Sequence, residues 1–281
     1  MSIRFTEHAP EVGAAFSMDV NRILYSGESP YQKIKVLETT HFGRVLLLDG
    51  LVMLTERDEF IYHEMIAHVP LFVYPNPEAV LIIGGGDGGT VREALRHPEV
   101  KRIDLVEIDR LVSEVCLEYL PGVSKNLLSE KVNCYFQDGV RYVNETNRRY
   151  NVIIIDSTDP VSVGEGLFTQ DFYYSCFNIL KEDGILVNQA ESPAFNRNWL
   201  QAIARKLKSV FPLTDFYQAH IPTYPSGHWL FGFASKTYHP LKDFQESKYH
   251  SCSLNFKYYN SDIHFGSFAL PNFVRELIET A

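Results

Sequence analysis

The chain has 281 residues, of which 45% are hydrophobic, so it can bury one large core or two unequal ones. Its formal net charge of -9 argues against a nucleic-acid-binding protein and is compatible with a cationic ligand. The four cysteines are widely separated and form no CxxC pair, so we expect neither a disulfide nor a cysteine metal site, and a reducing compartment.

The N-terminal residues MSIRFTEHAP lack the charged-then-apolar order of a signal peptide, and no apolar run reaches the roughly 18 residues that a membrane helix needs. We therefore expect a cytoplasmic protein that does not enter a membrane. From about Met18 to Leu54, short β-prone runs alternate with turns at Gly27, Gly43 and Asp49-Gly50, which predicts antiparallel hairpins. The apolar run VLLLDGLVML in this region suggests that it pairs with a second subunit.

The segment ERDEFIYHEMIAHVPLF has apolar residues at helical spacing, which predicts a helix that ends before Pro70. After Pro77, apolar strands alternate with amphipathic helices, as in a parallel sheet covered on both faces. The segment WLFGFAS is an expected further strand. We predict an α/β fold: an N-terminal antiparallel β-hairpin domain over residues 1–56, and a Rossmann-like, methyltransferase-type doubly wound sheet over residues 57–281.

The loop IIGGGDGGTVRE follows the first of these strands and places Gly84, Gly86 and Gly89 in G-x-G-x-x-G spacing before a helix. Glycines there allow a tight turn and close approach of a ligand to the helix N-terminus. Glu107 ends the next strand, where nucleotide-binding sheets place an acid on ribose hydroxyls. Together these features favour a nucleoside-type ligand over a merely flexible turn.

Asp87 lies inside the glycine loop, where a carboxylate would repel a pyrophosphate, so an adenosyl group with positive charge is the better candidate. Asp138 and Gly139 follow a third strand, and Asp138 either accepts from an adenine amino group or only shapes an Asp-Gly turn. The stretch NVIIIDSTDP ends a buried strand with Asp156 and Asp159. Because the carboxyl ends of such strands meet at one crevice, we expect these acids to converge there.

The chain resembles the spermidine synthases, which are polyamine aminopropyltransferases, over almost its whole length. Seven matching segments occur in order: YQKI (31–34), FGRVLLLDG (42–50), TERDEFIYHEM (55–65), VLIIGGGDGG (80–89), DSTDP (156–160), IPTYPSG (221–227) and KYYNSDIH (257–264). The resemblance implies transfer of an aminopropyl group from decarboxylated S-adenosylmethionine to a diamine, most often putrescine, giving spermidine and methylthioadenosine. The donor is then a co-substrate, and no cofactor and no metal are expected. A homodimer or homotetramer is implied as well.

The resemblance also implies residue roles. Gln32, Gly84, Gly86, Asp87, Glu107, Asp138 and Gly139 bind the donor, with Glu107 on the ribose and Asp138 near the adenine. Asp156 takes the proton of the attacking amine, and Tyr62, His63 and Asp159 hold that amine. Because a diamine also needs its far ammonium recognised, we add Tyr224 and Glu191 as our own candidates for that contact. Asp87 pairs with the ammonium of the decarboxylated donor and repels the carboxylated form.

Three alternatives stay open. The acids do not distinguish putrescine from agmatine, cadaverine or spermidine, because each presents a primary amine. An ordinary methyltransferase shares the fold, and Asp87 together with DSTDP argues against it. A non-catalytic nucleoside-binding protein would not need Tyr62, Asp156 and Asp159.

Three positions depart from the family pattern, and one metal motif is rejected. Ser162 and Val163 replace a Gly-Pro pair in the loop that gates the site, and Phe5 stands near the diamine end where a Trp is common. His63 and His68 are five residues apart rather than four, so they do not share a helix face for a zinc ion.

Overall fold

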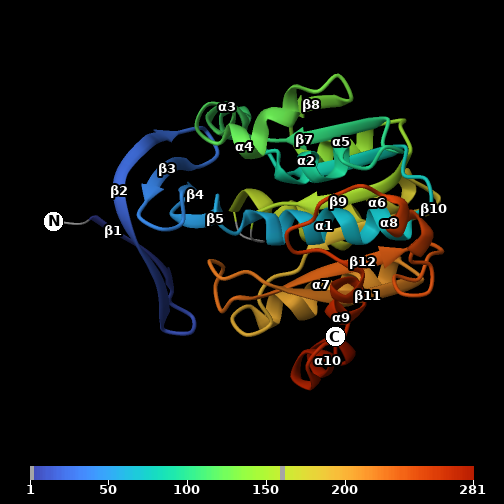
Figure 1. Cartoon of the computed structure of the whole chain (residues 1–281). Helices are drawn as coiled ribbons and strands as arrows, with labels where there is room; N and C mark the ends of the chain where they lie inside the picture. Colours follow the sequence, from blue (N-terminus) through green and yellow to red (C-terminus); the bar gives the residue numbers. More distant parts are fainter. Residues whose placement is uncertain (1–2, 159–161) are drawn as a thin grey trace.

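The computed structural model describes residues 3–158 and 162–281, with only the backbone of Ser162 and Val163 included. It contains two sheets, which Figure 1 shows side by side, the smaller N-terminal sheet in blue. In the part of the chain that is described, no helix is both long and apolar enough to cross a bilayer.

The smaller sheet is an antiparallel meander in which each strand is bonded to the next along the chain. Its strands are β1 (Ile3–Ala9), β2 (Ala14–Glu28), β3 (Lys33–Thr39), β4 (Arg44–Leu48) and β5 (Leu51–Thr55). The predicted hairpins are confirmed, but the sheet begins before Met18. The sequence did not indicate β1 because IRFTEHA has no clear apolar alternation, and most of its residues are partly or fully exposed.

The run VLLLDGLVML is explained by packing within the chain rather than by an exposed surface. Leu46 and Leu54 form an apolar cluster with Val112 and Cys116 of helix α3 (Arg110–Tyr119), and Leu47 belongs to a cluster on the other face of the sheet. The exposed large hydrophobic side chains of this region are instead Ile3, Val12, Ile23 and Tyr31.

The larger sheet has the strand order β11-β12-β10-β9-β6-β7-β8. Its strands are β6 (Ala79–Gly84), β7 (Arg102–Glu107), β8 (Val132–Phe136), β9 (Tyr150–Asp156), β10 (Leu180–Gln189), β11 (Leu213–His220) and β12 (His228–Ser235). Strands β6 to β10 are parallel, whereas β12 runs antiparallel to both β10 and β11. The predicted Rossmann-like fold is confirmed, and WLFGFAS lies within β12.

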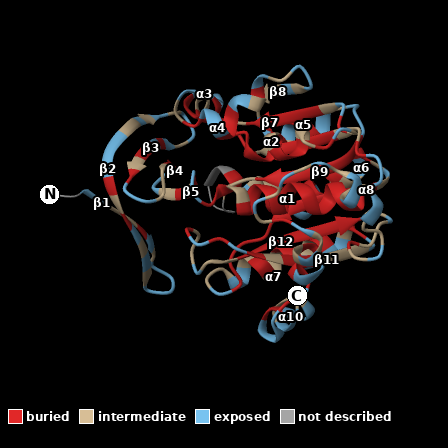
Figure 2. Cartoon of the chain, in the orientation of Figure 1, coloured by how far each residue is buried: buried red, intermediate tan, exposed pale blue. Residues whose placement is uncertain are grey.

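Helices cover both faces of this sheet, and the central strands are buried (Figure 2). The remaining helices are α1 (Glu59–Val73), α2 (Gly89–Leu95), α4 (Pro121–Ser124), α5 (Gly139–Glu145), α6 (Gln170–Ile179), α7 (Arg197–Val210), α8 (Glu246–Ser251), α9 (Ser261–Ser267) and α10 (Asn272–Glu279), with short 3-10 helices at Lys125–Leu128 and Ser162–Phe168. Successive residues of β9 alternate between the two cores: Val152 and Ile154 pack on the α1 side, whereas Ile153 and Ile155 pack with α6 and α7. This two-sided burial explains why β9 is apolar throughout.

The helix α1 continues through Pro70, so the prediction that it ends before this residue is wrong. Proline lacks the N–H that would bond the preceding turn and therefore disfavours a helix interior. Here Leu71, Phe72 and Val73 are fully buried, and this packing stabilises the last turn. Tertiary burial thus outweighs the local preference of proline.

Candidate active site

A cavity of about 310 Å³ lies at the carboxyl ends of β6, β7 and β9. The strand order reverses between β9 and β6, and such switch points are the usual ligand sites of open α/β sheets. Both sheets contribute walls, since Glu7 of β1 lines the cavity together with Asp156 of β9. The predicted site residues that line it are Gln32, Tyr62, His63, Gly84, Gly86, Asp87, Glu107, Asp138, Gly139, Asp156 and Tyr224.

The glycine loop is shaped by the residues that it approaches. Gly84 is the register partner of Asp156, and a Cβ at Gly84 would lie 2.1 Å from the Asp156 carbonyl oxygen. A Cβ at Gly89 would lie 2.2 Å from the ring of His63. Gly84 also has a left-handed φ of 80°, which a residue with a Cβ rarely adopts. These two glycines therefore let the acid of β9 and the imidazole of α1 reach the site.

Glu107 lies at the end of β7, beside the glycine loop. Its carboxylate accepts hydrogen bonds from the backbone N–H of Gly86 (3.2 Å) and of Asp109 (2.8 Å). Burial raises the pKa of Glu107 to about 7, although these two N–H groups oppose the shift. The protonation of this group therefore changes close to neutral pH.

Gln32 and Asp138 are held by different local structures. The side-chain amide of Gln32 donates to Asp109 Oδ2 (3.0 Å), which also accepts from the Ser29 hydroxyl. Asp138 is the N-cap of α5 and accepts from the Val140 N–H at 2.7 Å. Asp138 thus shapes the turn and lines the cavity at the same time, so the two interpretations of Asp138 do not exclude each other.

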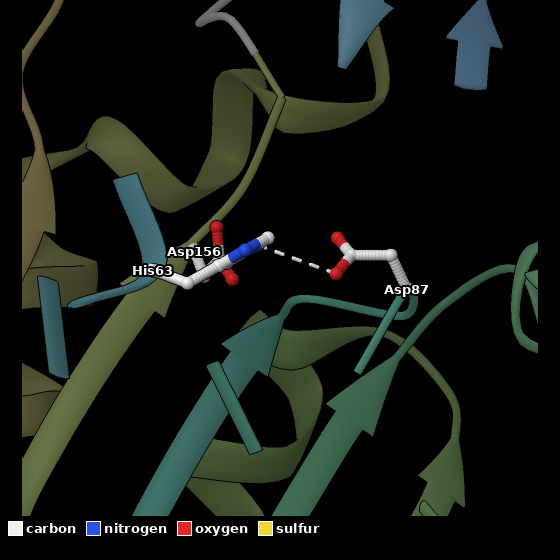
Figure 3. Close-up of side chains that lie close together, drawn as sticks. All are labelled: His63, Asp87 and Asp156. Carbon is white, nitrogen blue, oxygen red and sulfur yellow. Dashed lines mark ion pairs between the residues drawn. The ribbon is translucent and has the colours of Figure 1, made fainter. Parts of the chain in front are cut away.

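His63 lies between the carboxylates of Glu59 and Asp87, and Figure 3 shows its ion pair with Asp87. Its Nδ1 is 2.6 Å from Glu59, and its Nε2 is 3.3 Å from Asp87 Oδ1. Burial alone would lower the pKa of His63, but Asp87 and Glu59 raise it to about 10. The imidazole is therefore a cation at neutral pH, and it pairs with the acid of the glycine loop.

The pKa of Asp87 is correspondingly lowered: burial opposes ionisation, but the imidazolium of His63 and the Gly89 N–H outweigh it. One ligand-type atom from each of His63, Asp87 and Asp156 lies within 4.8 Å of the others. A protonated imidazole has no lone pair for a metal ion, so the cluster suits a cationic organic ligand better than a metal.

Asp156 accepts a hydrogen bond on each carboxylate oxygen. The Tyr62 hydroxyl donates to Oδ1 at 2.7 Å, and the Thr90 hydroxyl donates to Oδ2 at 2.6 Å. Burial and the nearby Asp87 raise the pKa of Asp156, and His63, Thr90 and Tyr62 oppose this shift. The result is an acid that binds a proton more readily than an exposed aspartate.

Aromatic side chains line the adjoining part of the cavity. Tyr224 donates its hydroxyl to the carbonyl oxygen of Met53 (2.7 Å), and its ring centroid lies 5.8 Å from that of Tyr62 and 4.9 Å from that of Trp229. Tyr224 thus connects the two sheets at the cavity wall. An apolar wall of this kind suits the methylene chain of a ligand.

Comparison with known proteins identifies the family. Residues 59–246 match the model described as "Spermine/spermidine synthase domain", and residues 3–56 match "Spermidine synthase tetramerisation domain". The chain belongs to the spermine/spermidine synthase family. This confirms the resemblance seen in the sequence, and with it the expectation of an aminopropyltransferase-type enzyme of polyamine biosynthesis.

Members of this family are similar to the chain over nearly its full length. The polyamine aminopropyltransferases of Alkaliphilus metalliredigens (strain QYMF) and Clostridioides difficile (strain 630) are 52% and 51% identical to it, with 99% of each chain covered. A spermidine synthase crystallised with the transition state analogue AdoDATO has a TM-score of 0.97 at 43% identity, with 99% of this chain and 96% of that chain covered. The spermidine synthase of Thermotoga maritima has a TM-score of 0.95 at 43% identity, with 99% of this chain and 95% of that chain covered.

Two expectations for the site, on Glu191 and Phe5, differ from the described cavity lining, and two others, on Asp159 and on Ser162-Val163, concern parts that the structure does not describe. Glu191 is buried, and its carboxylate accepts hydrogen bonds from the side chains of Gln189 and Asn196. Gln189 and Asn196 line the cavity, whereas Glu191 is not among the lining residues described. Phe5 packs in an apolar cluster of the N-terminal sheet, and Glu7 of the same strand lines the cavity instead. Asp159 lies outside the described residues, and the side chains of Ser162 and Val163, which depart from the family pattern, are not described either.

Sequence reasoning missed four residues that support the site. Asp109 holds Gln32, Thr90 holds Asp156, Glu59 holds His63, and Glu7 closes the wall by accepting from the Val52 N–H. Two of them have a sequence signal, since Asp109 follows the end of β7 and Thr90 follows the last glycine of the loop. Glu7 had none, because nothing in the sequence indicates that its side chain contacts Val52 of β5, at the opposite edge of the same sheet.

Proposed function

We propose that this chain transfers the aminopropyl group of decarboxylated S-adenosylmethionine to putrescine, which gives spermidine and methylthioadenosine. The observation that carries the proposal is the pairing of two acids in one cavity: Asp87 in the glycine loop and Asp156 at the end of the neighbouring strand. One acid suits the ammonium of a decarboxylated donor, and the other suits the amine that attacks it.

For the donor, Glu107 binds the ribose hydroxyls and Asp138 lies near the adenine, while Gly84, Gly86, Gly139 and Gln32 complete the pocket. Asp87 pairs with the donor ammonium and repels the carboxylate of the ordinary S-adenosylmethionine. This assignment is supported by the fact that all these residues line one cavity and by the lowered pKa of Asp87, which keeps it charged.

In the reaction, the nitrogen of the amine forms a bond to the carbon next to the sulfonium, and the bond from that carbon to sulfur breaks. Sulfur keeps the electron pair and becomes the thioether of methylthioadenosine, and the amine proton passes to Asp156. Tyr62, whose hydroxyl donates to Asp156 Oδ1, orients the same amine on the cavity side of the carboxylate. The cationic His63 disfavours a protonated amine next to it and so favours the neutral form that attacks. Since the sulfonium is already a good leaving group, no cofactor is needed.

We propose that Asp159 holds the attacking amine together with Asp156, and that Tyr224 lies along the diamine chain. Glu191 would act on the far ammonium through Gln189 and Asn196 rather than by direct contact, which fits its hydrogen bonds.

We also propose that residues 1–56 form an assembly domain and residues 57–281 the catalytic domain. The assembly domain exposes Ile3, Val12 and Ile23, which suit a contact between subunits of a homotetramer or homodimer.

The test is mass spectrometry of the products after the purified chain is incubated with decarboxylated S-adenosylmethionine and, separately, putrescine, agmatine, cadaverine or spermidine. Spermidine and methylthioadenosine from putrescine are the expected products, and the relative rates rank the other amines. A parallel incubation with ordinary S-adenosylmethionine serves as the donor control. Absence of an aminopropyl product with every amine, or a methylated product from the control donor, would contradict the proposal.

A further inference from the structure

We infer that Thr90 is a positioning residue: its hydroxyl fixes the carboxylate of Asp156 from the protein side, while Tyr62 holds the other oxygen from the cavity side. The inference rests on the proposed function, in which Asp156 accepts the proton. Tyr62 lines the cavity, whereas Thr90 is fully buried and is not among the lining residues described. The two donors thus act on one carboxylate from α1 and from α2.

The Thr90 hydroxyl is available because Thr90 is the second residue of α2, where no earlier helical carbonyl can accept it. A threonine in a helix commonly donates its hydroxyl to the backbone carbonyl three or four residues earlier. The residues three and four positions before Thr90, Asp87 and Gly86, precede this helix, and the Gly86 carbonyl accepts a 2.8 Å hydrogen bond from the Ser113 hydroxyl. The Thr90 hydroxyl instead reaches across to β9 and donates to Asp156 Oδ2 at 2.6 Å.

Two hydrogen bonds fix the orientation of the Asp156 carboxylate, which a single hydrogen bond would leave variable. The last side-chain torsion of aspartate is broad, so a carboxylate held by Tyr62 alone could turn about its bond to Cβ. A second donor on Oδ2 sets the plane of the carboxylate. The backbone closes around the same oxygen, since a Cβ at Gly85 would lie 2.8 Å from Oδ2. The carboxylate therefore presents a defined edge to the cavity, as proton transfer requires.

Thr90 also acts on the charge of Asp156. The ionisable or polar groups that face this carboxylate are Asp87 from the glycine loop, His63 and Tyr62 from α1, and Thr90 from α2. Burial and Asp87 raise the pKa of Asp156, and the hydroxyl of Thr90 is one of the groups that oppose them. Its loss should raise this pKa further, so that a larger fraction of Asp156 is protonated at neutral pH and unable to accept a proton.

The decisive variants are Thr90→Val, which keeps the shape and removes the hydroxyl, and Thr90→Ser, which keeps the hydroxyl. Thr39→Val is the matched control, because Thr39 is a buried threonine outside the described cavity lining whose hydroxyl donates to the Gly43 carbonyl. The first readout is a carboxyl-detected NMR titration of the ligand-free protein, with the Asp156 signal assigned by its loss in Asp156→Asn. The second is the pH dependence of kcat for aminopropyl transfer.

We expect Thr90→Val to raise the titration midpoint of Asp156 by about one pH unit and to shift the acidic limb of the kcat profile by the same amount toward higher pH. At pH 7, kcat should fall about tenfold. The donor Kd should stay within about twofold, because Thr90 lies outside the described lining. Thr90→Ser should restore most of the parent behaviour. A Thr90→Val protein with the parent titration and pH profile would overturn the inference, as would equal shifts in Thr39→Val. A parent chain without aminopropyl transfer would refute the proposed function, and the NMR titration would still decide whether Thr90 controls Asp156.

Discussion

The hydroxyl of Tyr62 donates a 2.7 Å hydrogen bond to Oδ1 of Asp156, although the two residues are 94 positions apart in the sequence. The contact joins the first turns of α1 to the end of β9 at the point where the strand order reverses. It places a hydroxyl and a buried acid with a raised pKa side by side at the cavity.

Replacing Asp156 with Asn should lower kcat by two or more orders of magnitude, because an amide cannot accept the amine proton. Methylthioadenosine binding, measured by calorimetry, should change little, since that ligand has no aminopropyl group. Asp215→Asn is the control, as Asp215 is a partly buried acid of β11 with a raised pKa that is not in the described cavity lining. Parent-level turnover in Asp156→Asn would exclude it as the proton acceptor.

Replacing Asp87 with Asn should reduce the preference for the decarboxylated donor over ordinary S-adenosylmethionine by tenfold or more. The amide neither attracts the ammonium nor repels the carboxylate. Titration calorimetry with both donors measures the ratio of the two Kd values. If the variant rejects the carboxylated donor as strongly as the parent, another residue sets this selectivity.

Binding of methylthioadenosine should weaken as the pH falls below about 7, because Glu107 has a pKa of about 7 and its charged form is the better acceptor for ribose hydroxyls. Glu107→Gln should bind more weakly at pH 8 and show a flatter pH dependence. Calorimetric Kd values between pH 5.5 and pH 8.5 check this. A parent Kd that is constant over this range would show that the protonation of Glu107 is not linked to ligand binding.

The stability of the ligand-free protein should depend on His63 at alkaline pH. The pKa of His63 is raised from its ordinary 6.5 to about 10, so its ion pairs contribute fully below about pH 6.5 and this contribution is lost as the pH rises to about 10. The free energy of unfolding, measured with denaturant, should therefore fall over this window in the parent and fall less in His63→Gln. Two parallel curves would mean that the imidazole is not held as a cation.

Local patterns in the sequence were enough to predict the class of fold and most residues of the candidate site. Local signals sufficed there: apolar strands alternate with helical segments, and the acids Asp87, Glu107 and Asp156 follow or end buried strands. Because parallel strands bring their carboxyl ends to one edge, such acids meet whatever the details of packing. The family resemblance then added their roles.

The residues that act through other residues could be identified only from contacts in the folded chain. Thr90, Glu59 and Asp109 become site residues because α2, α1 and the end of β7 bring them beside Asp156, His63 and Gln32. Pro70 stays inside α1 because the last turn is buried. Glu7 of β1 lines the cavity and accepts a hydrogen bond from Val52 of β5, although the two strands are at opposite edges of the sheet. These facts depend on contacts between segments far apart in the chain. Periodicity along the sequence carries no information about such contacts.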